Sequence, residues 1–158
     1  GRTLGDDFHT AALTFACVLE PGESLSSDRV IDEVGSMVSA SLHFWYELYQ
    51  QGGSDAFIRP EVRDIWDQYL VRVESMDPAR RHMLLHDGHC TYLMPEERKF
   101  VTPELIRASG GLVGEPDEII AMLKEQESAG LKEVTLLPPM AVARKNFADF
   151  ARHVIERY

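Results

Sequence analysis

Three short apolar runs, each closed by turn-forming residues, dominate the hydrophobic pattern of the chain and predict buried strands. The first is AALTFACVL, residues 11–19, which is followed by Glu-Pro-Gly. The second, GLVG, ends at Gly114, and the third, VTLL at 134–137, stops at two prolines that cannot continue the interior of a sheet. Unbroken apolar runs of this length are typical of parallel strands that are covered on both faces.

The second and third runs enclose a predicted helix of about four turns. Pro116 suits its first position, where a missing N–H costs nothing, and Asp117 and Glu118 place negative charge at the positive end of the helix dipole. Gly130 is the expected left-handed stop. A strand, a helix and a second strand in this order form a right-handed crossover, which predicts a parallel sheet.

Helical periodicity fills most of the remaining chain. Residues 27–51 carry apolar side chains at steps of three and four and end at a pair of glycines. They include an aromatic patch at 44–49, for which core or subunit packing and a ligand-binding wall are the two interpretations. A second helix is expected from Pro60 to the Asp-Pro pair at 77–78, a shorter one directly after it, and a closing helix over 142–158.

Length and charge narrow the class of protein. The 158 residues suffice for one domain with a real core. The 16 Lys and Arg against 26 Asp and Glu give a net charge of −10, and this argues against nucleic acid or an anionic membrane as a partner, because both require clustered positive charge. No apolar run approaches the ~20 residues of a membrane span, and Cys17 and Cys90 do not suggest a disulfide framework. We therefore predict a cytoplasmic protein.

The C-terminal third also carries a family resemblance. GEPDEIIAMLKEQESAGLKEVTLLPP, followed by NFADFARHVI, resembles the end of the luciferase-like flavin-dependent oxidoreductases. In that family a Gly-x-Pro-Asp/Glu-Glu-Ile/Val helix, an Ala-Gly-Leu/Val turn, a final barrel strand and a terminal helix follow one another. HTAALTFACVLEPGES and GHCTYLMPEERKFVTPELI are similar to the branch that uses the deazaflavin coenzyme F-420, to which methylene-tetrahydromethanopterin reductase belongs.

The resemblance implies a helix-rich α/β fold that corresponds to the C-terminal part, about strands six to eight, of a TIM (β/α)8 barrel. Residues 1–158 would form a single domain, with 54–109 as a helical insertion or lid. A complete barrel usually needs ~250 residues. The chain is therefore expected to be a truncation, a proteolytic product or one half of a split protein, which would form a homo-oligomer or associate with the missing N-terminal half.

The function implied by the resemblance is that of an oxidoreductase or monooxygenase. It would transfer hydride between F-420 or reduced FMN and a small organic substrate, and this part alone would be inactive. We expect Gly114 and Glu115, after the second strand, and Leu137 and Pro138, after the third, to form the rim of the cofactor site. The helix N-terminus at Glu115 is predicted to be self-capped by its own acidic residues. No catalytic residue is carried over from the family.

A polar segment in the predicted insertion supplies further candidates. His86, His89, Tyr92 and Arg98 are expected to contact substrate from the lid, with surface residues of no special role as the alternative. A metal-dependent enzyme with ligands at His86 and His89 is a weaker alternative, since Gly88 should break the helix that would align them and no metal is predicted. A different class also stays open: a cofactor-free α/β interaction module that associates through the aromatic helix 27–51.

Overall fold

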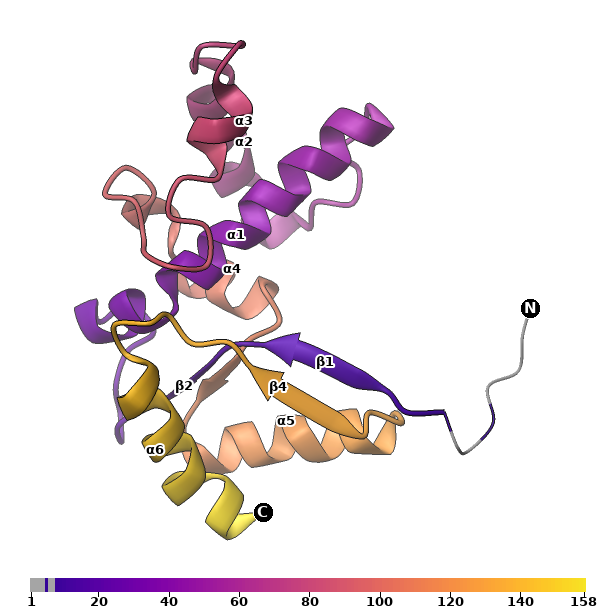
Figure 1. The fold of residues 1–158 in the computed structure, drawn as a ribbon, viewed down its shortest axis with the longest axis vertical. Helices are drawn as coiled ribbons and strands as arrows, with labels where there is room; N and C mark the ends of the chain where they lie inside the picture. Colours follow the sequence, from indigo (N-terminus) through magenta and orange to yellow (C-terminus); the bar gives the residue numbers. More distant parts are fainter. Residues whose placement is uncertain (1–4, 6–7) are drawn as a thin grey trace.

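The computed structural model describes Gly5 and residues 8–158, and in it short parallel strands are flanked by helices on both sides (Figure 1). The mixed α/β, helix-rich class predicted from the sequence is confirmed. The strands are β1 (Ala11–Thr14), β2 (Ala16–Val18), β3 (Leu112–Gly114) and β4 (Glu133–Leu136). The α-helices are α1 (Asp28–Gly52), α2 (Arg63–Glu74), α3 (Arg81–Leu85), α4 (Pro103–Ala108), α5 (Pro116–Ser128) and α6 (Ala143–His153), and single 3-10 turns are η1 (Pro60–Val62), η2 (Arg98–Phe100) and η3 (Ile155–Arg157).

The first apolar run forms both β1 and β2 and lies between the other two strands. β1 pairs in parallel with β4, and β2 pairs in parallel with β3. The parallel arrangement was predicted, but the order of the strands differs from that of a barrel. A barrel would place β3 next to β4, whereas the crossover through α5 here passes over the first run and returns on its far side. The described residues therefore form small parallel sheets and give no evidence for part of a TIM barrel.

The two faces of the first run belong to two different cores. Phe15, Cys17 and Leu19 are buried in a core formed with α1, α2 and α4. Ala16, which points to the opposite face, packs with Phe150 of α6 and with α5 and β4. This alternation follows from the two-residue period of a strand, and it explains why both faces of residues 15–19 are apolar.

Helix α1 connects the sheet to the other helices. At 25 residues it is about 37 Å long. Ser27 caps its start by accepting from the Val30 N–H, and Gly53, with φ of 65°, donates its N–H to Tyr49 at the end. The far half of α1 packs against α2, as Figure 1 shows. Trp66, fully buried, packs there with the α1 aromatics. Core packing, the first interpretation of the aromatic patch, thus holds for most of its rings.

The predicted crossover helix has the expected ends. It begins at Pro116, the side chain of Glu118 accepts from the Glu115 N–H at 2.8 Å, and Gly130 adopts φ of 100° after the last turn. The self-capped N-terminus is confirmed. The closing helix is shorter than predicted, because α6 ends at His153 and continues only as a 3-10 turn. No helix in the described part of the chain is long and apolar enough to cross a membrane.

Candidate functional site

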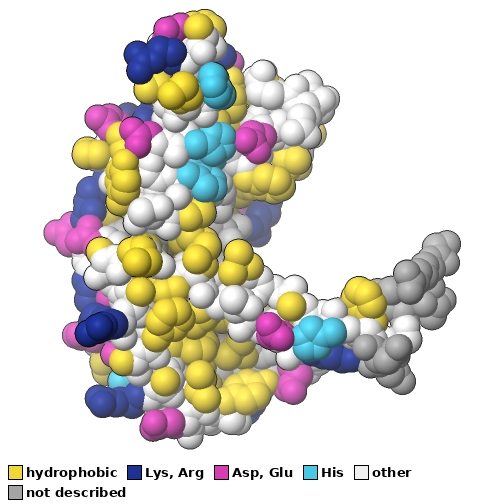
Figure 2. All heavy atoms as spheres, in the orientation of Figure 1, with side chains coloured by type: hydrophobic (Ala, Val, Ile, Leu, Met, Phe, Trp, Pro, Cys, Tyr) yellow, Lys and Arg dark blue, Asp and Glu magenta, His cyan; other side chains and the backbone are white. Residues whose placement is uncertain are grey.

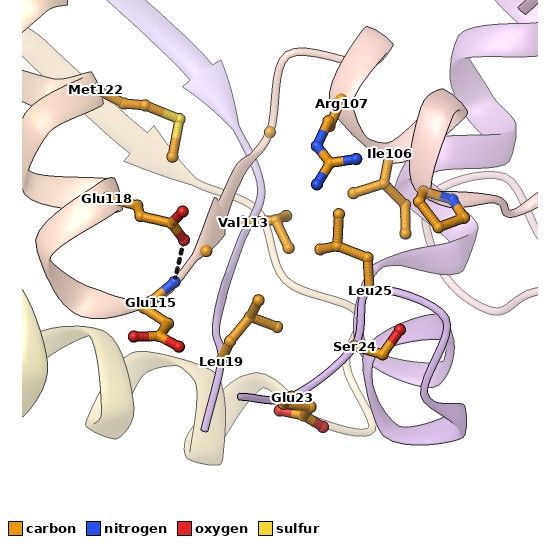
Figure 3. A pocket seen from close by; sticks show the side chains of 13 residues that line it. Leu19, Glu23, Ser24, Leu25, Ile106, Arg107, Val113, Glu115, Glu118 and Met122 are labelled. Carbon is orange, nitrogen blue, oxygen red and sulfur yellow. Dashed lines mark hydrogen bonds between the residues drawn. The ribbon is translucent and has the colours of Figure 1, made fainter. Parts of the chain in front are cut away.

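An open cleft of about 720 Å³ runs beside β3, whose outer edge has no strand partner among the described residues (Figure 3). Its apolar wall is built by Leu25, from the loop before α1, Ile106 of α4 and Val113 of β3. The cleft reaches the carboxyl end of β3 and the start of α5. In open α/β sheets, ligands bind in crevices outside the carboxyl ends of the strands, so this cleft has the position of a ligand site.

Carboxylates line the end of the cleft nearest α5, and all three are held in place. Arg29 donates to Glu23 and thereby lowers the pKa of that carboxyl to about 2. Glu115 accepts from the Gly22 N–H at 3.0 Å, and Glu118 caps the helix. This end of the cleft is therefore negative and would repel the anionic part of a ligand.

The opposite side of the cleft holds a cation. Arg107 projects from α4 toward the apolar wall, as Figure 3 shows. Its guanidinium makes no hydrogen bond or ion pair with the residues that the structure describes. The cleft is thus polarised, with a free guanidinium on the α4 side and bonded carboxylates on the α5 side. No sequence signal singled out Arg107, because it lies on a short helix whose position becomes clear only in the fold.

The four residues predicted to form the cofactor rim do not share one site. Gly114 and Glu115 line the cleft. Leu137 and Pro138 are absent from its lining; Leu137 donates its N–H to Thr14, on the far side of the first run. Glycine at position 114 is explained by packing, since a Cβ there would lie 2.8 Å from the Glu118 carboxylate.

The pairing register explains this separation. Leu136 is level with Thr14, and Gly114 is level with Val18. The ends of β4 and β3 are therefore offset by four residues along the first run and lie on opposite sides of it. With ~3.3 Å per residue and ~4.8 Å between strands, the two ends are about 16 Å apart. The shared rim expected from a barrel is not present.

The four residues predicted to contact substrate from the lid do not lie together in one site either. His86 and His89 come together, with ring centroids 5.2 Å apart, on the helical part of the face seen in Figure 2, where histidine side chains gather. The Tyr92 hydroxyl donates to Asp87. Arg98 forms ion pairs with Asp28 and Asp32, which anchor it to the start of α1. None of the four predicted residues lines the cleft beside β3. Helix α4, which lies within the predicted insertion, contributes residues to that cleft.

Two buried residues that the sequence analysis missed complete the histidine group. His43 of α1 is 1% exposed and Glu97 is 2% exposed, and the two side chains are in contact at 3.2 Å. His43 lies on the apolar stripe of its helix, three residues before the buried Tyr46. A histidine on an apolar stripe can be recognised in the sequence as a candidate buried polar group. Its partner Glu97 cannot be deduced from the sequence. Among the described residues, no three His, Cys, Asp or Glu side chains are arranged to hold a metal ion.

A scan against protein-family models finds no match to the chain, and neither do searches of the curated proteins and of the solved structures.

Proposed function

We propose that the chain is part of an oxidoreductase that binds coenzyme F-420 or reduced FMN in the cleft beside β3. The reaction would be hydride transfer to or from a small organic substrate. The observation that carries the proposal is the free guanidinium of Arg107 above the apolar wall of a cleft that reaches the carboxyl end of a parallel strand. The cleft volume of about 720 Å³ lies within the usual range of small-molecule sites.

The charges in the cleft support one orientation of such a coenzyme. A flat ring system would lie against Leu25, Ile106 and Val113, which exclude water from one of its faces. The anionic tail would lie toward Arg107, because Glu115 and the other carboxylates repel it at the opposite end. The coenzyme supplies the redox chemistry, and the residues of this chain orient it and set the electrostatic field around it.

The barrel that the sequence resemblance implies is a separate proposal. In a TIM barrel β4 would pair with β3 at the edge that borders the cleft, and the carboxyl ends of β3 and β4 would share a rim. Because β4 would then occupy the cleft, the coenzyme proposal rests on the strand order described above and not on the barrel. We expect coenzyme binding by the present chain without turnover, because most cofactor contacts in the family come from earlier strands.

Coenzyme binding to Arg107 variants tests the proposal. Titration of the chain with F-420 and with FMN, followed by fluorescence, should reveal binding of at least one. Arg107→Gln should weaken it by roughly 10- to 150-fold, which corresponds to a charge-assisted hydrogen bond of about 1.5–3 kcal/mol. Arg152→Gln is the matched control, since Arg152 is exposed on α6 and does not line the cleft. Binding of neither coenzyme, or equal effects of both substitutions, would reject the proposal.

A second candidate function is association through α1. Phe44 is 56% exposed and Leu13 is 64% exposed, and both line a groove of about 350 Å³ between α1 and β1. Large apolar side chains at an open sheet edge favour contact with another chain. If two copies of this chain associate there, sedimentation should show a dimer that Phe44→Glu dissociates. Val71→Glu, on the exposed side of α2, is the control. A monomeric wild-type chain at high concentration excludes this candidate.

A further inference from the structure

A line of hydrogen-bonded ionisable groups runs from the interior of the helical part of the molecule to its surface. The buried carboxylate of Glu97 lies 3.3 Å from Arg72 Nη1 and 3.2 Å from His43 Nε2. The other ring nitrogen of His43, Nδ1, lies 2.9 Å from Nδ1 of His89. His89 is exposed, so the line ends at an imidazole that solvent and small molecules reach.

The acceptors along this line determine where the protons lie. A carboxylate only accepts, so His43 donates from Nε2 to Glu97. In neutral His43, Nδ1 is then an acceptor, and His89 must donate to it from its own Nδ1. This leaves the lone pair of neutral His89 on Nε2, which makes no hydrogen bond among the residues described. A carboxylate thus orients one imidazole, and that imidazole orients a second one, whose free nitrogen is the nucleophilic atom.

The backbone around His89 holds the ring in this position. Gly88 before it has φ of 73°, and Cys90 after it has φ of 56°, a conformation that is strained for a residue with a Cβ. Tyr92 packs over Gly88, where a Cβ would lie 2.5 Å from the Tyr92 carbonyl oxygen. Strained non-glycine residues cluster at functional sites, and here the strain belongs to the turn that presents the histidine.

Charges around His89 favour its neutral form. Partial burial lowers the pKa of His89, and a proton bound to the neighbouring His43 or His86 lowers it further, while Glu47 and Glu97 act in the opposite direction. His86 faces two acceptors: its Nε2 lies 3.1 Å from the Glu47 carboxylate and its Nδ1 lies 3.0 Å from the His82 carbonyl oxygen. The neutral form of His89, which carries the free Nε2, is therefore favoured.

We propose that His89 Nε2 is a nucleophilic centre that accepts the acyl group of an activated ester, with His43 and Glu97 as positioning residues. Nε2 attacks the carbonyl carbon, a bond to the acyl group forms and the bond to the alcohol or phenol oxygen breaks; the leaving alkoxide or phenolate takes a proton from water. The Nδ1 proton of His89 passes to His43 Nδ1, and Glu97 stabilises the resulting imidazolium. Water then cleaves the acyl-imidazole and the proton returns to His89, so the net reaction is ester hydrolysis.

This site is distinct from the cleft beside β3. His43 lies about 22 Å along α1 from Asp28 at the start of the helix, at 1.5 Å per residue, whereas the cleft is bordered by the loop that precedes that start. The proposal therefore does not depend on coenzyme binding. Failure of either proposal leaves the other unaffected.

Hydrolysis of p-nitrophenyl acetate by the full chain tests the nucleophile. His89→Gln should lower the second-order rate constant by about tenfold or more. His82→Gln is the matched control, because His82 lies in the same segment, is exposed and has no part in the line of hydrogen bonds; its rate should stay within about twofold of wild type. Mass spectrometry after brief treatment with diethyl pyrocarbonate should find His89 modified before His82. Equal rates for wild type and His89→Gln would overturn the proposal.

The roles of the neighbours are tested by variants that keep the fold, checked by circular dichroism. His43→Gln should lower the rate while leaving His89 accessible to diethyl pyrocarbonate. His86→Gln should move the midpoint of the pH–rate profile upward, because it removes the positive charge that a protonated His86 places beside His89 and so raises the pKa of His89. A purely structural role for His86 would change the amplitude of the profile and not its midpoint. An unchanged midpoint together with an unchanged His43→Gln rate would refute the relay.

Discussion

Glu97 joins the segment before α4 to both α1 and α2, and its replacement tests how the helical part of the molecule is held together. The carboxylate is 2% exposed and lies 3.2 Å from His43 Nε2 and 3.3 Å from Arg72 Nη1. Glu97→Gln preserves the volume of the side chain but removes its charge. The guanidinium of Arg72, whose side chain is 18% exposed, then loses its counter-charge inside the protein.

The expected loss of stability follows from the burial of this pair. Removal of one partner of a buried ion pair costs about 3–5 kcal/mol, and a hydrogen bond to a charged group contributes about 1.5–3 kcal/mol. Arg72 keeps some hydration and glutamine can still accept one hydrogen bond, so we expect a loss of about 2–3 kcal/mol for Glu97→Gln. At roughly 2–4 °C per kcal/mol for a chain of this length, the midpoint of thermal unfolding should fall by about 4–12 °C.

Urea unfolding followed by circular dichroism measures this loss. Glu96→Gln, at the exposed neighbouring position, is the control and should change the free energy of unfolding by less than about 0.5 kcal/mol. Combining Glu97→Gln with Arg72→Met removes both charges, so the double variant should be more stable than the sum of the two single effects by about 0.5–3 kcal/mol. Strict additivity, or a Glu97→Gln loss as small as that of the control, would refute the reasoning.

Two further predictions concern the core around the first apolar run. Gly111→Ala should lower the free energy of unfolding by about 1–3 kcal/mol, because an added Cβ would lie 2.2 Å from the Phe15 ring. Gly52→Ala is the control, since a Cβ there meets nothing within 4 Å. Equal urea midpoints for the two variants would contradict the packing argument. Burial raises the pKa of the Cys17 thiol to about 12. Iodoacetamide at mildly alkaline pH should therefore label only Cys90 until urea is added, and early labelling of Cys17 in the mass spectrum would contradict this.

Local features of the fold were predictable because their causes lie within a few residues of sequence. Within the apolar run, β2 forms because each of the two faces of residues 15–19 meets a core, and α5 starts and stops where Pro116 and Gly130 require. The order of the strands was not predictable in the same way. The order depends on which strand edge β4 pairs with, and about a hundred residues of helix and loop separate β4 from the first run. The apolar pattern of β4 is compatible with either edge.

The histidine site shows the same limit at the level of side chains. His86 and His89 are close in sequence, and their association was foreseeable. His43, Arg72 and Glu97 come from three separate segments, and only the packing of α2 and of residue 97 against α1 brings them together. Arg98, by contrast, was a conspicuous charge whose partners on α1 give it a structural role. The surface part of the site, His86 and His89, could be predicted because the two residues are close in sequence. The buried part, His43, Arg72 and Glu97, could be recognised only from the tertiary structure.

In the observed strand order β4 pairs with β1, whereas in a barrel it would pair with β3. Engineered cysteine pairs in a Cys90→Ser chain can show which of the two strands is the neighbour of β4. Ala12 and Val134 are register partners on adjacent parallel strands, about 4.8 Å apart, so Ala12→Cys with Val134→Cys should form a disulfide under mild oxidation. Val113→Cys with Val134→Cys should not, because the first run separates β3 from β4 by at least about 9 Å. A barrel predicts the reverse. Efficient oxidation of the second pair and not the first, measured by mass spectrometry, would show that β4 pairs with β3 in solution.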